Sequence, residues 1–195
     1  MPRKVREVVD GGIYHVYARG NNGQQLFDET RDYECYMGLL GAVKKKYHFN
    51  LYHYCLMPNH MHMLLKVEEG KTLSRMMHWV QLGYTRYYKG KYGYYGHVYQ
   101  GRFRSPRISD ESYYLQCGRY IERNPVRGGM TQECADYEWS SARFYVKGIR
   151  NALITPNPFY QEMGETVKER QERYHRFLSL DEPYSAMVDE GLGKL

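Results

Sequence analysis

The stretch FNLYHYCLMPNHMHMLLKV, residues 49–67, consists of two mainly apolar runs separated by a Pro-Asn pair. A turn-forming pair between two such runs is typical of a β-hairpin, so the stretch predicts two adjacent antiparallel strands. Alternate side chains of a strand project to the same face of the sheet. His60 and His62 therefore share one face of the second strand, where burying two imidazoles has a cost in free energy that other groups must offset.

The segments before and after this hairpin are predicted to form further strands and helices. Hydrophobic periodicity predicts four of them: a strand at 11–22, helices at 28–47 and 72–89, and a strand at 97–108. With the hairpin, they give the order strand, helix, strand, strand, helix, strand, which is the split βαβ pattern of a ferredoxin-like domain. The sequence thus predicts an α+β fold with one antiparallel sheet and helices packed on one of its faces.

The chain is long enough for one domain with a real core and a further C-terminal element, since it has 195 residues. We expect residues 1–150 to form the main domain and residues 151–195 to form a C-terminal helical extension or tail. A late charged helix is expected at 166–180, and residues 181–195 are expected to be poorly ordered.

Composition argues against several classes of protein. No apolar run approaches the roughly 18 residues of a membrane span, and the basic N-terminus lacks the apolar core of a secretory signal. The four cysteines are spread along the chain without any Cys-x-x-Cys pair: Cys35, Cys55, Cys117 and Cys134. This spacing argues against a zinc ribbon or a disulfide scaffold and predicts buried thiols in a reducing compartment. We therefore expect a cytoplasmic protein.

Positive charge and tyrosine are concentrated in one part of the chain. The net charge is +6, and residues 71–107 contain eight Lys or Arg residues, seven tyrosines and no acidic residue. Cations neutralise phosphates and aromatic rings stack on unpaired bases, so this composition favours a single-stranded nucleic acid as the partner. The alternative is that many of these tyrosines belong to the core. From residue 159 onward acidic residues outnumber basic ones, so the basic surface is expected on the main body.

A second group of polar side chains is expected on a third helix, which should begin after Ser109 and end at about Asn124, before Pro125. Tyr120 and Asn124 are four residues apart, so they lie on one face of this helix. A phenol can act as a nucleophile, and an amide oxygen can bind a hard metal ion. Two imidazoles on one strand face can share a metal ion as well. On these residues alone, a core tyrosine and a plain helix end remain the simpler interpretations.

Five short motifs occur in order along the chain: YHVYARGNN (14–22), MPNHMHMLL (57–65), YQGRFRS (99–105), RYIERNPVRGGM (119–130) and DYEWSSARFY (136–145). Together they resemble the single-tyrosine HUH transposases, in which two histidines flank a bulky hydrophobic residue. The NPVR sequence is most similar to the branch associated with repetitive extragenic palindromic (REP) elements. The resemblance implies a transposase, or a domesticated relative, that nicks and rejoins single-stranded DNA at palindromic hairpins.

The resemblance also implies roles for individual residues. His60, His62 and Asn124 would bind a divalent metal ion, Mg²⁺ or Mn²⁺, and Tyr120 would attack a DNA phosphate to give a 5′-phosphotyrosine. Compact members of the family have a glutamine where this chain has Asn124. The acceptor of the phenol proton stays open among the metal-bound phosphate, a water and His15, and for His15 itself we expect a structural role.

Further residues are candidates for contacts to the DNA backbone or to a hairpin guide sequence: Gln100, Arg102, Arg104, Arg19 and Asn21. The first three alternate along the strand-like segment at 97–108, which predicts that they project to one side. Solvated surface residues are the alternative interpretation of the same pattern.

Other functions remain open at this stage. One is a catalytically idle single-stranded nucleic-acid-binding protein on the same fold, although a decayed enzyme has no reason to keep all four implied site residues. Another is a metal-dependent phosphodiesterase without a covalent step. The family includes dimers that exchange the tyrosine helix and monomers that do not, so a homodimer is possible. The motifs do not encode the DNA sequence that is recognised.

Overall fold

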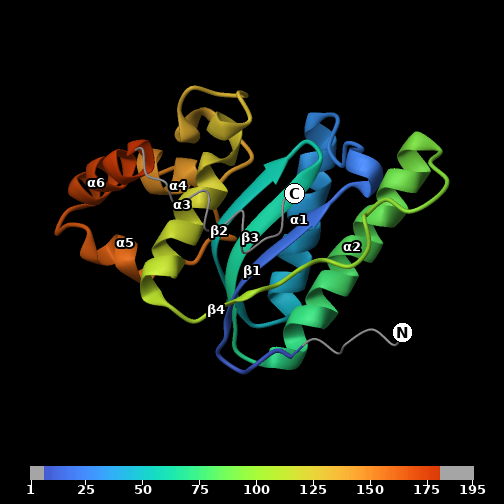
Figure 1. The fold of residues 1–195 in the computed structure, drawn as a ribbon, viewed down its shortest axis with the longest axis horizontal. Helices are drawn as coiled ribbons and strands as arrows, with labels where there is room; N and C mark the ends of the chain where they lie inside the picture. Colours follow the sequence, from blue (N-terminus) through green and yellow to red (C-terminus); the bar gives the residue numbers. More distant parts are fainter. Residues whose placement is uncertain (1–6, 181–195) are drawn as a thin grey trace.

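The computed structural model describes residues 7–180, and its centre is a four-stranded antiparallel sheet (Figure 1). The strands are β1 (Ile13–Arg19), β2 (Phe49–Met57), β3 (His60–Val67) and β4 (Arg107–Ile108). Their spatial order is β2-β3-β1-β4, which is the order produced by two interleaved βαβ units in a ferredoxin-like sheet. The predicted α+β class is therefore confirmed, and both strands of the hairpin have the predicted bounds.

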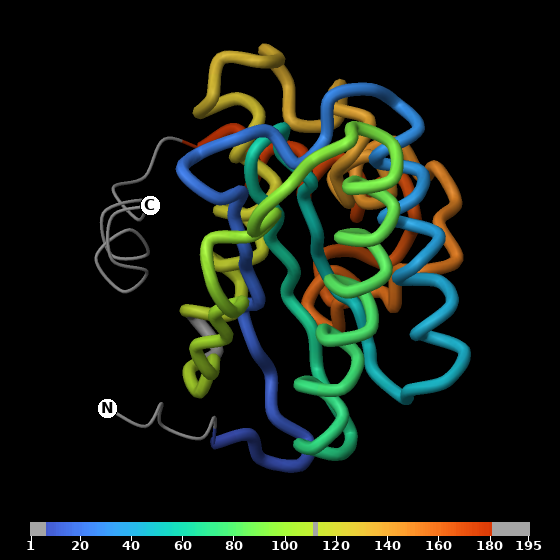
Figure 2. The backbone as a smooth tube through the Cα atoms, turned by 90° about the vertical axis from the view of Figure 1, so that its right-hand side faces the viewer, coloured from blue at the N-terminus to red at the C-terminus, as the bar shows by residue number. Residues whose placement is uncertain are grey.

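Helices cover both faces of this sheet (Figure 1, Figure 2). The helices that belong to the ferredoxin-like unit are α1 (Thr30–Lys46) and α2 (Gly70–Tyr92). They pack together on one face, as the sequence predicted for this unit. The third helix, α3 (Glu111–Arg127), lies on the opposite face and packs against β2 and β3. Burial on both sides explains why β2 and β3 are buried along almost their whole length.

Alternate residues of β3 face these two layers. Met61, Met63 and Leu65 lie in the core beneath α1 and α2, whereas His62 and Leu64 lie on the side of α3. The apolar residues between the histidines thus belong to the main core. The histidines belong to the opposite face, which is where the alternation in the sequence predicted they would lie together.

Helix α3 differs from its predicted bounds at both ends. Its N-cap is Asp110, whose side chain accepts a hydrogen bond from the Tyr113 backbone N–H, so the predicted cap at Ser109 was wrong by one position. The helix also continues through Pro125. Proline cannot donate to the carbonyl of Ile121, but Nδ2 of Asn124 donates to that carbonyl at 3.3 Å. This side-chain bond compensates for the missing backbone donor and lets the helix run on.

The segment at 97–108 follows the edge of β1 but is mostly not a regular strand, so this prediction was correct only at Arg107–Ile108. Isolated bridges join Gly20 to Tyr99 and Tyr17 to Arg104. Between these bridges Gly101 has a φ of +78°, a left-handed conformation that interrupts a strand.

The C-terminal part of the described chain consists of short helices that pack beside α3. They are α4 (Ala142–Lys147), α5 (Pro158–Glu162) and α6 (Val167–Ser179). A 3₁₀ turn at Cys134–Asp136 precedes them, and another, at Asn21–Gly23, follows β1. The predicted helix at 166–180 corresponds to α6, whose N-cap Thr166 forms a capping box with Glu169. Residues 181–195, for which poor order was predicted, lie outside the described residues. The predicted domain boundary at residue 150 stays a prediction.

A buried carboxylate ties this extension to α3 and to the sheet. Glu122 of α3 is fully buried and accepts hydrogen bonds from His53 Nδ1 at 2.8 Å, from Ser141 Oγ at 2.5 Å and from the Tyr174 hydroxyl at 2.8 Å. A β-bulge between Leu51 and His53 helps to turn the His53 side chain toward α3. One charged group thus links β2, α3, α4 and α6.

The prediction of buried thiols is correct for three of the four cysteines. All four cysteines are free; three are buried, and Cys35 is half-buried. Burial raises the pKa of Cys117 and of Cys55, so these thiols are not activated nucleophiles. Within residues 7–180, no helix is both long and apolar enough to cross a membrane.

Many tyrosines of the 71–107 segment have structural roles, in agreement with the alternative prediction that they belong to the core. Tyr84 and Tyr99 are buried in the core. Tyr87 and Tyr92 donate hydrogen bonds to the buried carboxylate of Asp32, which joins α2 to the start of α1. Tyr95, by contrast, is 95% exposed and remains free to stack on a base.

Candidate active site

The histidine pair of β3 forms one wall of the candidate site. The ring centroids of His60 and His62 are 5.0 Å apart, and the rings are nearly perpendicular. His62 is fully buried, whereas His60 is half-buried at the start of the strand. The two-residue spacing on one strand therefore brings the imidazoles within reach of a single ligand.

Helix α3 forms the opposite wall and carries the other two predicted site residues. The ring of Tyr120 lies edge-on to that of His62, with the centroids 5.7 Å apart. One turn further along the helix, Oδ1 of Asn124 lies 3.5 Å from Nε2 of His60. The structure thus brings together all four residues that the resemblance implied, within one chain.

Hydrogen bonds fix which atoms of His60 and Asn124 face each other. Nδ2 of Asn124 donates to the carbonyl of Tyr120 at 2.8 Å, so its Oδ1 points toward His60. Nδ1 of His60 lies 2.6 Å from Oδ1 of Asn59, which can only accept, so Nδ1 carries the proton. In the neutral ring Nε2 then has a lone pair. Two acceptor atoms therefore face each other across 3.5 Å, an arrangement that a cation between them would stabilise.

The structure also adds a third histidine to this group. Nε2 of His15, on β1, lies 2.9 Å from Nδ1 of His62. Alternation along β1 places His15 and Tyr17 on the same face, but only the pairing of β1 with β3 shows that His62 lies beside them. No local sequence pattern therefore predicts this contact.

Burial keeps the imidazoles neutral. Burial lowers the pKa of His15 to about 3 and also lowers the pKa of His60. The pKa of His62 is held well below its ordinary value, first by burial and then by electrostatic interactions with His15, His60 and Arg127. Neutral rings keep the lone pairs that metal binding needs. The guanidinium carbon of Arg127 itself lies 4.9 Å from the centre of the Tyr120 ring.

These donors fit a divalent metal ion. Nε2 of His62 is buried without a hydrogen-bond partner among the described residues, and an ion would satisfy it. Two imidazole nitrogens and one amide oxygen form the donor set, which suits Mn²⁺ better than Mg²⁺. No group of three His, Cys, Asp or Glu residues that could hold a metal occurs between residues 7 and 180.

The predicted DNA contacts lie at the edge of the sheet beside this site. Gln100, Arg102 and Arg104 are all exposed, whereas Arg19 and Asn21 are half-buried. Arg19 pairs with His60 across β1 and β3, so it lies next to the site.

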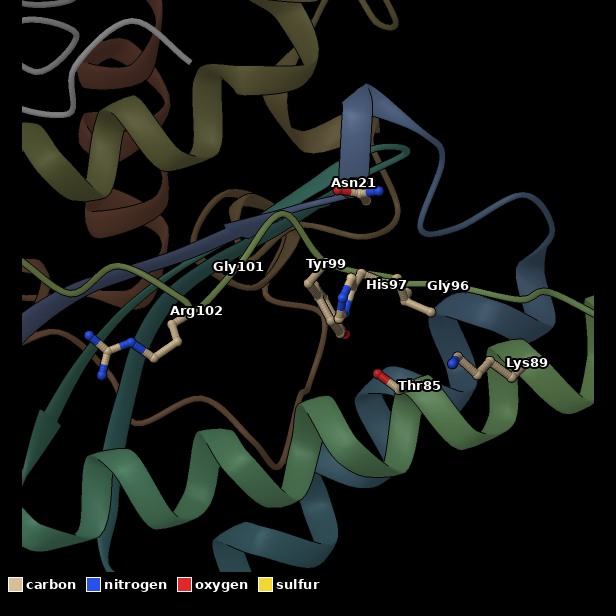
Figure 3. Close-up of a pocket in the computed structure, with 9 residues that line it drawn as sticks. Asn21, Thr85, Lys89, Gly96, His97, Tyr99, Gly101 and Arg102 are labelled. Atoms are coloured by element: carbon tan, nitrogen blue, oxygen red, sulfur yellow. The ribbon is translucent and has the colours of Figure 1, made fainter. Parts of the chain in front are cut away.

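A surface pocket of about 480 Å³ lies between α2 and the segment that follows it (Figure 3). It is lined by Asn21 and Arg102, together with Lys89 and His97. Two of the predicted DNA-contact residues thus share one pocket with further basic side chains. Lys89 is one of the eight basic residues counted in 71–107, but neither its approach to Asn21 nor that of His97 is visible in the sequence, because both depend on tertiary packing.

Comparison with known proteins identifies the class to which this fold and site belong. The family model described as "Transposase IS200 like" matches residues 8–124, which include β1 to β4 and both walls of the site. The chain therefore belongs to the IS200-like transposase family. No curated protein gives a significant match.

Two solved structures are similar to this chain. A REP-associated tyrosine transposase, solved with a bound REP hairpin, has 22% sequence identity and a TM-score of 0.65; the match covers 80% of this chain and 93% of that one. A putative transposase from Deinococcus radiodurans R1 has 16% identity and a TM-score of 0.43, over 63% of this chain and 97% of the other. The family model confirms the resemblance to transposases, and the first structure shows that this chain shares the fold of a REP-associated transposase.

Proposed function

We propose that this protein is a metal-dependent DNA transposase and endonuclease that nicks and rejoins single-stranded DNA at palindromic hairpins through a covalent 5′-phosphotyrosine. The observation that carries this proposal is the meeting of β3 with α3. It places Tyr120 beside His62, and Asn124 beside His60 although 64 residues separate them in the sequence. Membership of a transposase family supports DNA as the substrate.

In this proposal His60, His62 and Asn124 hold a divalent ion, Mg²⁺ or Mn²⁺. When bound, the ion neutralises charge on a DNA phosphate and so stabilises the transition state. The chain contributes the ligand geometry. Asn59 holds the proton of His60 on Nδ1, and the helix carbonyls hold the amide of Asn124 with its oxygen outward.

Tyr120 is the proposed nucleophile. Its phenol oxygen loses its proton and attacks phosphorus, and the bond from phosphorus to the 3′-oxygen breaks. The phenol proton passes, through an acceptor such as a water, to the departing oxygen and gives a free 3′-OH. Arg127 would stabilise negative charge that develops on the phenol, because its guanidinium carbon lies 4.9 Å from the centre of the Tyr120 ring. Because one phosphate ester replaces another, attack by a 3′-OH reverses the step and rejoins DNA without ATP.

The proposed substrate is single-stranded DNA that folds into a hairpin. The exposed Gln100, Arg102 and Arg104 would contact its backbone or guide sequence. Arg19 pairs with His60 across the sheet, and Asn21 lines the same pocket as Arg102, so both would lie near the bound DNA. The solved REP-associated transposase is bound to a REP hairpin, which supports the same kind of ligand for this chain. Because the tyrosine and the histidines meet within one chain, we propose that each protomer completes its own site.

A covalent-adduct assay tests this function. The protein is incubated with end-labelled hairpin oligonucleotides and Mn²⁺, and we expect a labelled protein band that survives denaturing electrophoresis. Tyr120→Phe should abolish the band. Tyr114→Phe is the matched control, because Tyr114 lies on the same helix and its buried hydroxyl has no hydrogen-bond partner among the described residues.

Other outcomes of the assay favour the alternative functions. Salt-sensitive DNA binding without any nick in Mg²⁺ or Mn²⁺ would favour a catalytically idle binding protein. Cleavage in ¹⁸O-water that places the heavy isotope in the product phosphate would favour a phosphodiesterase that uses water directly. Either outcome would contradict the role proposed for Tyr120.

A further inference from the structure

One proton is shared between two fully buried rings beside the candidate site. Nε2 of His15 lies 2.9 Å from Nδ1 of His62, and neither side chain has measurable solvent exposure. A neutral imidazole carries one N–H, so one ring donates in this hydrogen bond and the other accepts. The remaining nitrogens, Nδ1 of His15 and Nε2 of His62, have no hydrogen-bond partner among the described residues.

The direction of this hydrogen bond decides whether His62 can bind a metal ion. If His15 donates, His62 must carry its own proton on Nε2, and that nitrogen has no lone pair to offer. If His62 donates through Nδ1, its Nε2 becomes a free lone pair. Only the second direction matches His60, where Nδ1 donates to Asn59 and Nε2 faces the amide oxygen of Asn124.

We propose that His15 is a positioning residue whose Nε2 accepts the Nδ1 proton of His62, so that Nε2 of His62 is presented to the metal as a lone pair. This inference rests on the proposed function, since it concerns the same metal site. His15 does not bind the ion. It does for His62 what Asn59 does for His60, and the bond strengthens when metal binding polarises the N–H that His62 donates.

The packing around His15 supports this role because it holds the ring in one orientation. Tyr17 pairs directly with His62 across β1 and β3, which makes His15 the diagonal neighbour of His62 on the same face. The rings of Tyr17 and Tyr120 lie 5.3 Å and 6.1 Å from that of His15, measured between centroids. The acceptor nitrogen is thus fixed by the sheet register and by neighbouring rings.

Metal affinity tests the proposal without reference to cleavage. Mn²⁺ is titrated into the full-length protein, and free Mn²⁺ is measured by electron paramagnetic resonance. His15→Leu removes the acceptor, and we expect affinity to fall by about 10–100-fold, the usual effect of losing such a partner. His15→Gln retains an oxygen that can accept the same proton, so it should recover much of the lost affinity. Equal affinity of His15→Leu and wild type would overturn the proposal.

A second measurement uses only the wild-type protein and therefore does not depend on a variant that folds. The protein is labelled with ¹⁵N-histidine and loaded with diamagnetic Zn²⁺, and nitrogen–nitrogen coupling across the hydrogen bond is recorded by NMR. We expect the shared proton on Nδ1 of His62. A proton on Nε2 of His15 would overturn the inference even if the metal is bound.

These results separate the inference from the function on which it rests. If wild type binds Mn²⁺ and forms the Tyr120 adduct while His15→Leu binds Mn²⁺ equally well, the role of His15 alone is wrong. If wild type binds no metal at the histidines, the metal-dependent function fails, and the role of His15 fails with it.

Discussion

The two faces of the sheet use neighbouring residues of one strand for different purposes. On the side of α1 and α2, Met61, Met63 and Leu65 are fully buried in an apolar core. On the side of α3, His62 is equally buried but lies among other polar groups. A single residue step along β3 thus separates side chains of the apolar core from the histidines of the candidate site, because successive residues alternate between faces.

The face of the sheet beneath α3 contains two groups of buried polar side chains, which differ in whether their polar atoms have hydrogen-bond partners. At Glu122 the buried carboxylate is satisfied by three donors. At the histidines, Nε2 of His62 has no partner among the described residues, and the acceptors of His60 and Asn124 face each other. Buried polar groups are normally paired, so unpaired acceptors that gather in one place suggest a ligand.

The largest contrast should come from alanine substitutions at the adjacent buried positions 62 and 63. His62→Ala removes a proposed ligand, and we expect Mn²⁺ affinity to fall by more than about 100-fold, since even loss of a supporting partner costs about 10–100-fold. Met63→Ala should leave the Mn²⁺ affinity of the folded protein close to that of wild type. Calorimetric titration of both variants checks this, and equal losses of affinity would break the distinction between the two faces.

Removal of the buried carboxylate should have the next largest effect. Glu122→Ala leaves the donors of His53, Ser141 and Tyr174 without their acceptor, and we expect the free energy of unfolding to fall by about 3–5 kcal/mol. Glu122→Gln keeps an oxygen acceptor and should cost less. Urea denaturation measures both variants, and a cost below about 1 kcal/mol for alanine would show that this network does not hold α3.

Met63→Ala should also destabilise the protein, by a different mechanism. Its side chain is fully buried, so truncation loses apolar contacts and leaves a cavity, with an expected cost of about 2–5 kcal/mol. Urea denaturation of this variant tests whether the α1 and α2 face is the main source of stability. A neutral effect would contradict that assignment.

Acid should weaken the α3 face through its buried histidines. Because the pKa of His15 is lowered to about 3 in the folded state, the unfolded chain binds more protons below its ordinary pKa of about 6.5. The free energy of unfolding should therefore fall between about pH 6.5 and 3, by up to about 1.4 kcal/mol per pH unit for this residue. His15→Gln should make the decline less steep in urea melts across this range. Identical slopes would contradict the assignment.

The smallest effect is expected at the exposed sheet edge. Arg102→Gln should weaken binding of single-stranded DNA only a few-fold and should lower the slope of log affinity against log salt by about 0.7, as for one lost phosphate contact. Fluorescence anisotropy at several salt concentrations measures this slope. An unchanged slope would remove Arg102 from the DNA-binding surface.

Much of this arrangement follows from local sequence patterns. The hairpin, the shared face of His60 and His62, and the four-residue spacing of Tyr120 and Asn124 all depend on periodicities of two and about 3.6 residues. Local patterns did not predict the continuation of α3 through Pro125, because a side-chain amide replaces the missing donor there.

Local sequence patterns also do not predict contacts between segments that are distant in the chain. The bond between His15 and His62 depends on the register of β1 with β3, which no single strand encodes. The irregular course of 97–108 depends on a left-handed Gly101. Similarly, the composition of 71–107 does not distinguish base-stacking tyrosines from structural ones, whereas the structure shows that Tyr87 and Tyr92 donate hydrogen bonds to Asp32.

The most direct test of the whole account is to locate the covalent bond to DNA. After reaction with a hairpin oligonucleotide and Mn²⁺, the protein is digested with nuclease and protease, and the peptides are sequenced by mass spectrometry. The account predicts a nucleotide attached through phosphate to Tyr120 in the α3 peptide, and no such peptide when Mn²⁺ is chelated. Attachment at any other residue, or cleavage of DNA without a modified peptide, would contradict it.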